Sequence, residues 1–366
     1  MSNGTRLAAL GGVVVAGSLA LSACGTDQNP PPAGGGAPAF VDCVKTTVNA
    51  AGSSAQNNAV TEWIKGYQYS CPGASLNYNP SGSGAGVQSF ISGQVAFAGS
   101  DSTLKPDEVG PARRRCQGGN ALHLPMVVGP VAVAYNLPGV SDLRVSPKTI
   151  AGIFAGKITR WNDPAIKQDN PDAALPALPV KSVHRADESG TTDNFTSFLA
   201  DTAPDIWTYQ PGKKWNAPGG QGGAKSDGVT TIVRQTEGAV GYIEMSYADN
   251  ARLDTAKVAN GAGEYVALSP GSASKALAGA EVTGTGNDLA MKIDYATDTP
   301  GAYPIILVTY EIVCATGLSG EEGEFVKAFL TYTSSSAGQR VLTDLGYAPL
   351  PPTLRTKVQT AVKALA

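Results

Sequence analysis

The chain has 366 residues, of which only 16% are charged, and its formal net charge at pH 7 is −3. This length allows two or three domains, and the 44 Gly and 25 Pro residues are typical of an exported globular protein with many loops. With two histidines and no Cys-x-x-Cys pair, the sequence gives no support for a zinc site.

Residues 1–23 have the organisation of a lipoprotein signal peptide. A basic residue precedes an apolar stretch, Leu7 to Leu19, that is too short to span a membrane. The next residues, Leu-Ser-Ala-Cys, resemble a bacterial lipobox, which implies cleavage before Cys24 and lipidation of its sulfur. Residues 24–39 are rich in Pro, Gly and Ala and are predicted to form a flexible tether. We therefore expect an exported protein, anchored by lipid to the outer face of the cell membrane.

Four further cysteines are candidates for disulfide bonds: Cys43, Cys71, Cys116 and Cys314. Four cysteines in an exported protein suggest two disulfides. Three pairings are possible, and we favour Cys43–Cys71 with Cys116–Cys314.

The segment from 46 to 102 alternates strands with small-residue turns and helices. Strands are predicted at 46–49, 76–78 and 95–99, and turns rich in Ser and Gly follow the first two at 50–56 and 80–86. Such alternation predicts α/β organisation with largely parallel sheets. In these sheets ligands bind beyond the carboxyl ends of the strands, where all these turns lie.

Two long apolar runs, 124–135 and 303–310, are predicted to cross between two domains. The chain would then return to its first domain at the end. This places 40–127 plus 302–366 in lobe I and 128–301 in lobe II.

The stretch from Val183 to Phe195 reads as a strand end, a polar turn and a helix start. Ser189, Gly190 and Thr191 stand at the predicted helix start, where free N–H groups and the helix dipole favour an anion. Arg185 adds a positive charge and a planar fork of donors. The alternative is an ordinary Ser-capped helix beside a surface Arg.

Asp101 follows the predicted strand at 95–99 and would repel an anion that carries no proton. A carboxylate at this position is suitable if the ligand is hydrogen phosphate, because it can accept a hydrogen bond from the ligand O–H. Sulfate has no O–H group. A site built to bond such a group can reject an analogue lacking it by ~10⁴–10⁵-fold. The alternative is a Ser-Asp pair that caps the next helix. Asp187 could hold Arg185 by a bidentate pair or be an ordinary turn residue.

Several nucleotide and enzyme motifs are absent from the sequence. The Gly-Ser-Gly-Ala-Gly stretch at 82–86 lacks the Gly-Lys-Ser/Thr of a Walker A loop and the last glycine of a dinucleotide fingerprint. Gly-x-Ser-x-Gly and His-Glu-x-x-His do not occur. We therefore expect a non-catalytic protein with no metal, no cofactor and no nucleic-acid partner.

Four motifs in this order resemble the substrate-binding protein of the Pst-type ABC phosphate importer, closest to its lipidated actinobacterial members. They are Ser-Gly-Ser-Gly-Ala-Gly-Val at 81–87, Phe-Ala-Gly-Ser-Asp at 97–101, Gly-Ile-Phe-Ala-Gly-Lys-Ile-Thr-Arg-Trp-Asn-Asp-Pro at 152–164, and Arg-Ala-Asp-Glu-Ser-Gly-Thr at 185–191. The likeness runs from about 46 to 350, nearly the whole chain after the leader.

This resemblance implies an α/β, two-lobed periplasmic-binding-protein type II (Venus-flytrap) fold with two hinge strands and phosphate in the cleft. The implied phosphate-binding residues are Ser54, Ala55, Ser83, Asp101, Arg185, Ser189, Gly190 and Thr191. Many relatives have Thr and an aromatic residue where Ser54 and Ala55 stand, and Glu188 replaces a Gly found in others; we expect Glu188 to point to solvent.

The predicted function is extracytoplasmic binding of inorganic phosphate and its delivery to the transmembrane subunits of an ABC permease. Two alternatives use the same fold: an exported phosphate-ester hydrolase, which would need a nucleophile or metal cluster, and a surface adhesin or sensor.

Overall fold

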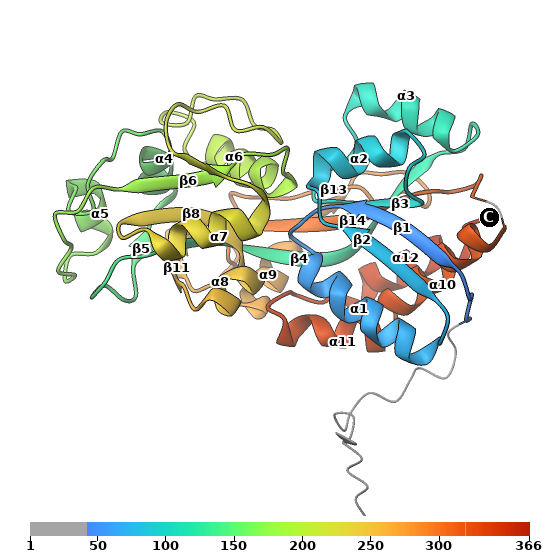
Figure 1. Ribbon diagram of the computed structural model, residues 1–366. Coiled ribbons are helices and arrows are strands. Elements are labelled where there is room, and N and C mark those ends of the chain that lie inside the picture. The colour runs from blue at the N-terminus through green and yellow to red at the C-terminus, as the bar shows by residue number, and fades with distance from the viewer. Residues whose placement is uncertain (1–41, 319) are drawn as a thin grey trace, which may run out of the picture. The chain divides into compact units, whose positions relative to one another are not determined.

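A computed structural model describes residues 42–318 and 320–366, in which helices alternate with strands around a nine-stranded mixed sheet (Figure 1). The predicted signal peptide, Cys24 and the predicted tether at 24–39 lie outside the described residues. The strand order of the large sheet is β2-β1-β3-β14-β4-β8-β6-β7, and β9 pairs with β4. The predicted α/β class is confirmed.

The first part of the chain forms three parallel strands at one end of this sheet, with β1 in the centre. α1 is amphipathic and buries Ala59, Val60, Trp63 and Tyr67, which lie on one face at helical spacing. The elements of this part are β1 (Thr47–Gly52), α1 (Asn57–Ser70), β2 (Ser75–Asn79), α2 (Ser83–Ile91), β3 (Phe97–Ser100) and α3 (Pro106–Arg115).

Two long strands, β4 (Ala121–Tyr135) and β14 (Ile306–Cys314), run antiparallel through the middle of the sheet. They correspond to the two apolar runs predicted to cross between domains. β4 pairs with β14 from Ala121 to Pro130 and with β8 from Val131 onward, so one strand joins the two halves of the sheet. Both strands are buried along nearly their whole length, as expected for strands covered on both faces.

The middle of the chain forms the other end of the sheet, where β6 runs parallel to β7 and β8. The parallel arrangement predicted from the sequence therefore holds at both ends of the sheet but not in its centre. The elements of this part are β5 (Arg144–Val145), α4 (Pro147–Phe154), α5 (Pro164–Asp169), β6 (Lys181–Arg185), α6 (Gly190–Thr202), β7 (Gln221–Gly223), α7 (Lys225–Gln235), β8 (Ala239–Glu244), α8 (Met245–Ala251) and β9 (Asp254–Thr255).

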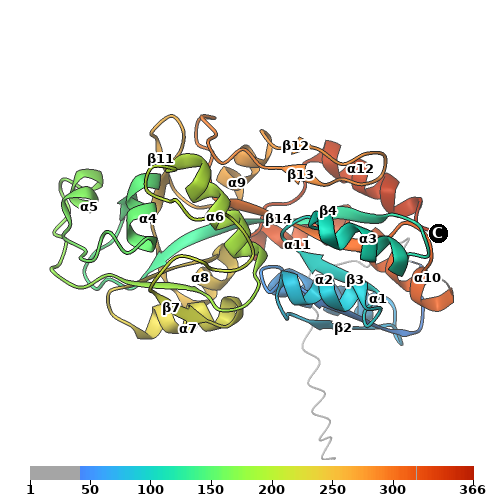
Figure 2. The ribbon, with the colours of Figure 1, turned by 90° about the horizontal axis from the view of Figure 1, so that it is seen from above.

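The remaining elements include two small sheets, β11-β10-β5 and the pair β12-β13. In Figure 2 the β12–β13 pair lies on the side of β4 and α12, and Leu289 N donates to the carbonyl of His123 in β4. These elements are β10 (Lys257–Ala259), β11 (Tyr265–Val266), α9 (Pro270–Leu277), β12 (Glu281–Val282), β13 (Met291–Lys292), α10 (Gly320–Thr333), α11 (Ser336–Asp344) and α12 (Pro352–Lys363).

The buried apolar residues form separate clusters. The largest joins β1, β2, β3 and the first half of β4 to α1, α10 and α12, and it also takes in Ala273, Ala276 and Leu277 of α9. A second cluster joins the second half of β4 to α4, α6 and β8, and a third lies under α7 and α8. Each end of the sheet thus has its own core.

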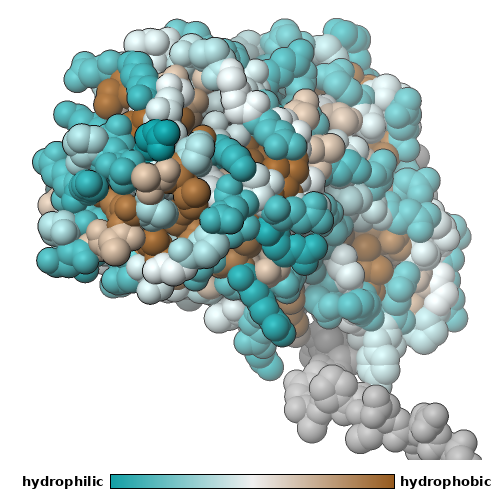
Figure 3. All heavy atoms as spheres, turned by 60° about the vertical axis from the view of Figure 1, so that its left-hand side comes forward, coloured by the Kyte–Doolittle hydropathy of each residue, from teal (hydrophilic) through white to brown (hydrophobic). Residues whose placement is uncertain are grey.

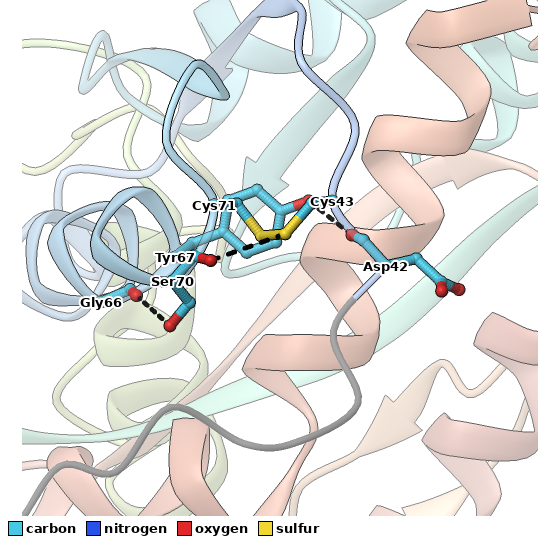
Figure 4. The surroundings of a disulfide bond; sticks show 6 residues. All are labelled: Asp42, Cys43, Gly66, Tyr67, Ser70 and Cys71. Atoms are coloured by element: carbon cyan, nitrogen blue, oxygen red, sulfur yellow. Dashed lines mark hydrogen bonds between the residues drawn. A yellow bond between two sulfur atoms is a disulfide. The ribbon is translucent and has the colours of Figure 1, made fainter.

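Both favoured disulfides are present. Cys43–Cys71 joins the start of the described chain to the end of α1, beside a hydrogen bond of 3.1 Å from the Tyr67 hydroxyl to the Asp42 carbonyl (Figure 4). Cys116–Cys314 joins the end of α3 to the end of β14 across 198 residues of sequence. Such long-range cross-links restrict the unfolded chain.

Every helix among the described residues is too short or too polar to cross a lipid bilayer. On the face shown in Figure 3, apolar residues gather in several patches that polar residues separate. Apolar area of this kind is ordinary on a folded protein surface.

Candidate functional site

The predicted strand, turn and helix start around Arg185 are confirmed as local structure. Arg185 is the last residue of β6, and Ser189 is the N-cap of α6, whose side chain accepts a hydrogen bond from Thr192 N at 3.2 Å. Gly190 and Thr191 form the first turn of the helix and are buried. The N–H groups of this turn and the helix dipole favour negative charge at this point.

Arg185 is held in one orientation by Asp187. Its Nε and Nη2 donate to the two carboxylate oxygens at 2.9 and 2.6 Å, which is the bidentate pair considered from the sequence. Burial acts to raise the pKa of Asp187, but the hydrogen bonds and charge of Arg185 outweigh it, so the pKa is lowered. Nη1 makes long contacts of 3.4 Å with the hydroxyls of Thr191 and Ser226. This nitrogen therefore faces the start of α6.

Asp101 follows β3 and is 4% exposed, with hydroxyl donors around both carboxylate oxygens. Ser53 Oγ lies 2.7 Å from each oxygen, Thr309 Oγ1 donates to Oδ1 at 2.7 Å, and Ser83 Oγ donates to Oδ2 at 3.1 Å. Burial raises the pKa of Asp101 to about 6, an effect that the hydroxyl donors oppose and the nearby charge of Glu244 increases. The carboxylate is thus ionised at neutral pH and can accept a further proton-bearing group.

Ser83 of α2, Asp101 after β3 and Gly190 of α6 lie in contact with one another. Ser83 Oγ accepts hydrogen bonds from Asp101 N and Gly190 N, each at 3.2 Å. Asn194 Nδ2 donates to the Asp101 carbonyl at 2.7 Å, which ties α6 to the end of β3. A Cβ on Gly190 would lie 2.6 Å from Asp101 Cβ, so only glycine permits this approach.

Ser54 and Ala55 precede α1 and are fixed largely through their backbone. Their carbonyls accept hydrogen bonds from Tyr247 at 2.8 Å and Tyr347 at 2.7 Å, respectively. Ser54 Oγ lies 2.9 Å from Ser226 Oγ and accepts from Ser226 N at 3.2 Å. The start of α1 is thereby joined to the start of α7, and Ser226 also contacts Arg185.

Four residues at this site were not predicted from the sequence: Ser53, Ser226, Glu244 and Thr309. Glu244 is fully buried; its Oε1 accepts from Thr191 Oγ1 at 2.5 Å, while its Oε2 has no hydrogen-bond partner among the described residues. Thr309 is separated from Asp101 by 208 residues. The one local feature that could have indicated any of the four is the position of Thr309, a polar residue within the apolar run 303–310.

Glu188, which we expected to point to solvent, pairs with Lys214 at 3.0 Å, and its side chain is 36% exposed. Its carbonyl accepts a hydrogen bond from Gly84 N at 3.1 Å. The carboxylate is therefore part of a surface ion pair. Among residues 42–318 and 320–366, no group of three or more His, Cys, Asp or Glu side chains could hold a metal ion.

Comparison with known proteins identifies the family. The model of the PBP superfamily domain matches residues 37–337. The Phosphate-binding protein PstS 3 of Mycobacterium tuberculosis is 44% identical over 368 residues, covering 99% of each chain, and its namesake in Mycobacterium leprae is 43% identical over 362 residues, covering 97% of each. A solved phosphate-binding protein from Stenotrophomonas maltophilia shares the fold with a TM-score of 0.68 at 21% identity, covering 86% of this chain and 93% of its own. The chain therefore belongs to the PstS family of phosphate-binding proteins, within the PBP superfamily.

Proposed function

We propose that this protein binds inorganic phosphate outside the cytoplasm and delivers it to an ABC permease. The observation that carries the proposal is an ionised, buried acceptor, Asp101, set against the helix start at Ser189–Gly190–Thr191 and the guanidinium of Arg185. A fully desolvated anion needs hydrogen-bond partners for nearly all its oxygens. Hydroxyls, helix-start N–H groups and one arginine supply donors, and Asp101 accepts the proton of hydrogen phosphate.

The proposed phosphate-binding residues are the eight given by the family resemblance. Seven would donate: Ser54, Ala55, Ser83, Arg185, Ser189, Gly190 and Thr191, with Ala55 and Gly190 acting through backbone N–H. Several of these donors already bond to protein acceptors, as Thr191 does to Glu244. Phosphate would therefore replace protein acceptors when it binds. In the ligand-free protein these acceptors limit the free-energy cost of burying the donors.

We propose that the site closes between two lobes joined by β4 and β14. The boundaries predicted from the sequence are 40–127 plus 302–366 for one lobe and 128–301 for the other. The packing of α9 and Leu289 into the first apolar cluster supports assigning 270–289 to the first lobe instead, whereas Tyr295 packs into the second cluster. In either division, Ser83 and Asp101 lie on one lobe and Arg185 with the start of α6 on the other.

The proposed location is the outer face of the cell membrane, with the lipidated Cys24 and the 24–39 tether holding the folded part near the permease. This proposal is supported by the lipobox-like sequence at 21–24. The wild-type protein should incorporate a labelled fatty acid, and the Cys24→Ser variant should not. A wild-type protein without the label would contradict lipid anchoring without affecting the phosphate proposal.

The direct test is titration calorimetry of the purified protein with phosphate and with sulfate at pH 7.5. We expect tight phosphate binding and little or no heat with sulfate, which cannot donate a proton to Asp101. Comparable affinity for both anions would contradict the role of Asp101. Binding of neither anion, or turnover of p-nitrophenyl phosphate, would instead favour the adhesin or hydrolase alternatives.

A further inference from the structure

Lys213 is a buried cation close to the proposed phosphate site. It lies in the connection between α6 and β7, and its carbonyl accepts a hydrogen bond of 2.9 Å from Ser189 N, the N-cap of α6. The neighbouring Gly212 N donates to Thr196 Oγ1 at 3.1 Å. These two bonds fix the backbone of Lys213 against the first two turns of α6.

The ammonium group of Lys213 has no hydrogen-bond partner among the described residues, although the residue is only 2% exposed. Within the described part of the chain, its one ionic contact is with Glu108 Oε2, at 3.8 Å. A buried ammonium is costly unless an opposite charge compensates it. The position of Glu108 therefore decides whether Lys213 can remain buried.

Glu108 is itself held rigidly on α3. Its Oε2 accepts Lys105 N at 2.8 Å in a capping box, and its Oε1 accepts Gln88 Nε2 from α2 at 3.4 Å. α3 packs into the first apolar cluster through Ala112, whereas Trp207 and Ala217, on either side of Lys213, pack into the second. The ion pair thus connects the two halves of the molecule next to the start of α6.

We propose that Lys213 and Glu108 are positioning residues for phosphate retention: their contact stabilises the closed arrangement and slows release of the bound anion. This inference rests on the proposed function. Neither charged group contacts the proposed phosphate-binding residues, so the pair affects phosphate by stabilising the closed arrangement of the two lobes. Separation of the lobes would break the contact and return both charges to water, and removal of one partner alone would leave the other charge buried and uncompensated.

The neighbouring Lys214 provides a matched control. It also pairs with a glutamate, Glu188, but its side chain is 77% exposed and both partners lie in the same half of the chain. Exposed ion pairs of this kind contribute little to stability. Loss of the Lys214 ammonium should therefore leave phosphate release unchanged.

The test compares the full-length protein with the Lys213→Met, Glu108→Gln, Lys213→Met/Glu108→Gln and Lys214→Met variants. Each is loaded with radiolabelled phosphate and chased with excess unlabelled phosphate, and its folding is checked by circular dichroism. We expect each of the two single variants of the buried pair to release phosphate about tenfold faster or more. The double variant should release phosphate more slowly than either single variant, because no uncompensated charge remains. The release rate of Lys214→Met should match that of the wild type.

Equal release rates for wild type and both single variants of the buried pair would overturn the inference while leaving the proposed function intact. So would strictly additive effects in the double variant, or an equal effect of Lys214→Met. If one single variant does not fold, the other still decides the outcome. Failure of the wild type to retain any phosphate would overturn the proposed function and this inference with it.

Discussion

The replacement Asp101→Asn is the sharpest perturbation of the proposed site. The carboxylate accepts hydroxyl hydrogen bonds on both oxygens, from Ser53, Thr309 and Ser83. An amide keeps one acceptor oxygen and turns the other position into a donor. With the oxygen kept toward Thr309, the NH₂ group would face Ser83 and the proposed ligand.

Two opposing effects should nearly cancel in the stability of the ligand-free protein. Burial raises the pKa of Asp101 from its ordinary value of 3.8 to about 6, a shift of about two units, or roughly 3 kcal/mol against the ionised form at neutral pH. The variant removes this penalty, but its NH₂ group cannot accept the hydrogen bond from Ser83, and a bond of this kind to a charged group contributes ~1.5–3 kcal/mol. We expect a small net change in the free energy of unfolding at pH 7.5.

Anion discrimination should change far more than stability. Hydrogen phosphate loses the acceptor for its proton, at a cost of ~1.5–3 kcal/mol, or roughly ten- to over a hundredfold in affinity. Sulfate gains a donor and no longer meets a buried negative charge. The ratio of phosphate to sulfate affinity should therefore fall by at least ~10²-fold.

Titration calorimetry with both anions at pH 7.5, together with thermal melts without ligand, measures both quantities. Asp142→Asn is a suitable control, because that carboxylate is exposed and pairs with Lys257 at 2.5 Å. A variant at Asp101 that keeps the wild-type ratio of phosphate to sulfate affinity within a few-fold would refute the reasoning. A large loss of stability without altered discrimination would show that Asp101 has only a structural role.

Three further predictions follow from the same contacts. Arg185→Lys cannot keep the bidentate pair with Asp187 and should weaken phosphate binding by roughly ten- to a hundredfold in calorimetry. Gly190→Ala would place a methyl carbon 2.6 Å from Asp101 Cβ and should weaken binding by separating α6 from the end of β3. The ligand-free protein should lose stability as the pH rises, because burial raises the folded-state pKa of Asp101 to about 6 and of Glu311 to about 8. The contribution of each carboxyl is full below its unfolded-state pKa and is lost as the pH rises through its folded-state pKa; thermal melts from pH 5 to pH 9 measure it.

Each of these predictions has a control variant or an outcome that would contradict it. Gly110→Ala on α3 adds a Cβ that meets only Arg114 Nη1, at 3.8 Å, and should leave phosphate affinity unchanged. An equal effect of the two glycine replacements would contradict the proposed approach at Gly190. Wild-type phosphate affinity in Arg185→Lys would contradict the claim that binding needs the guanidinium group held by its bidentate pair with Asp187. Glu311→Gln should flatten the stability profile between pH 6 and pH 8, and an unchanged profile would exclude Glu311 as its source.

Much of the local structure at the proposed site was predictable from the sequence. Ser189 and Gly190 begin a helix, and Asp101 directly follows a strand, because capping residues, glycines and apolar periodicity act over a few neighbouring residues. The four cysteines from Cys43 onward form the two favoured disulfides. Turn chemistry alone thus indicated where an anion could meet the chain.

The tertiary structure alone decided which distant groups complete the site. Thr309 reaches Asp101 because β14 returns antiparallel beside β3. Glu244 reaches the start of α6, and Ser226 reaches the start of α1. Both contacts depend on the pairing of β8 with β4 and β6. The antiparallel return of β14 and the burial of Lys213 beside Glu108 likewise depend on long-range packing. The physical reason is that strand register and charge burial are set by contacts between residues far apart in the sequence, on which a local pattern carries no information.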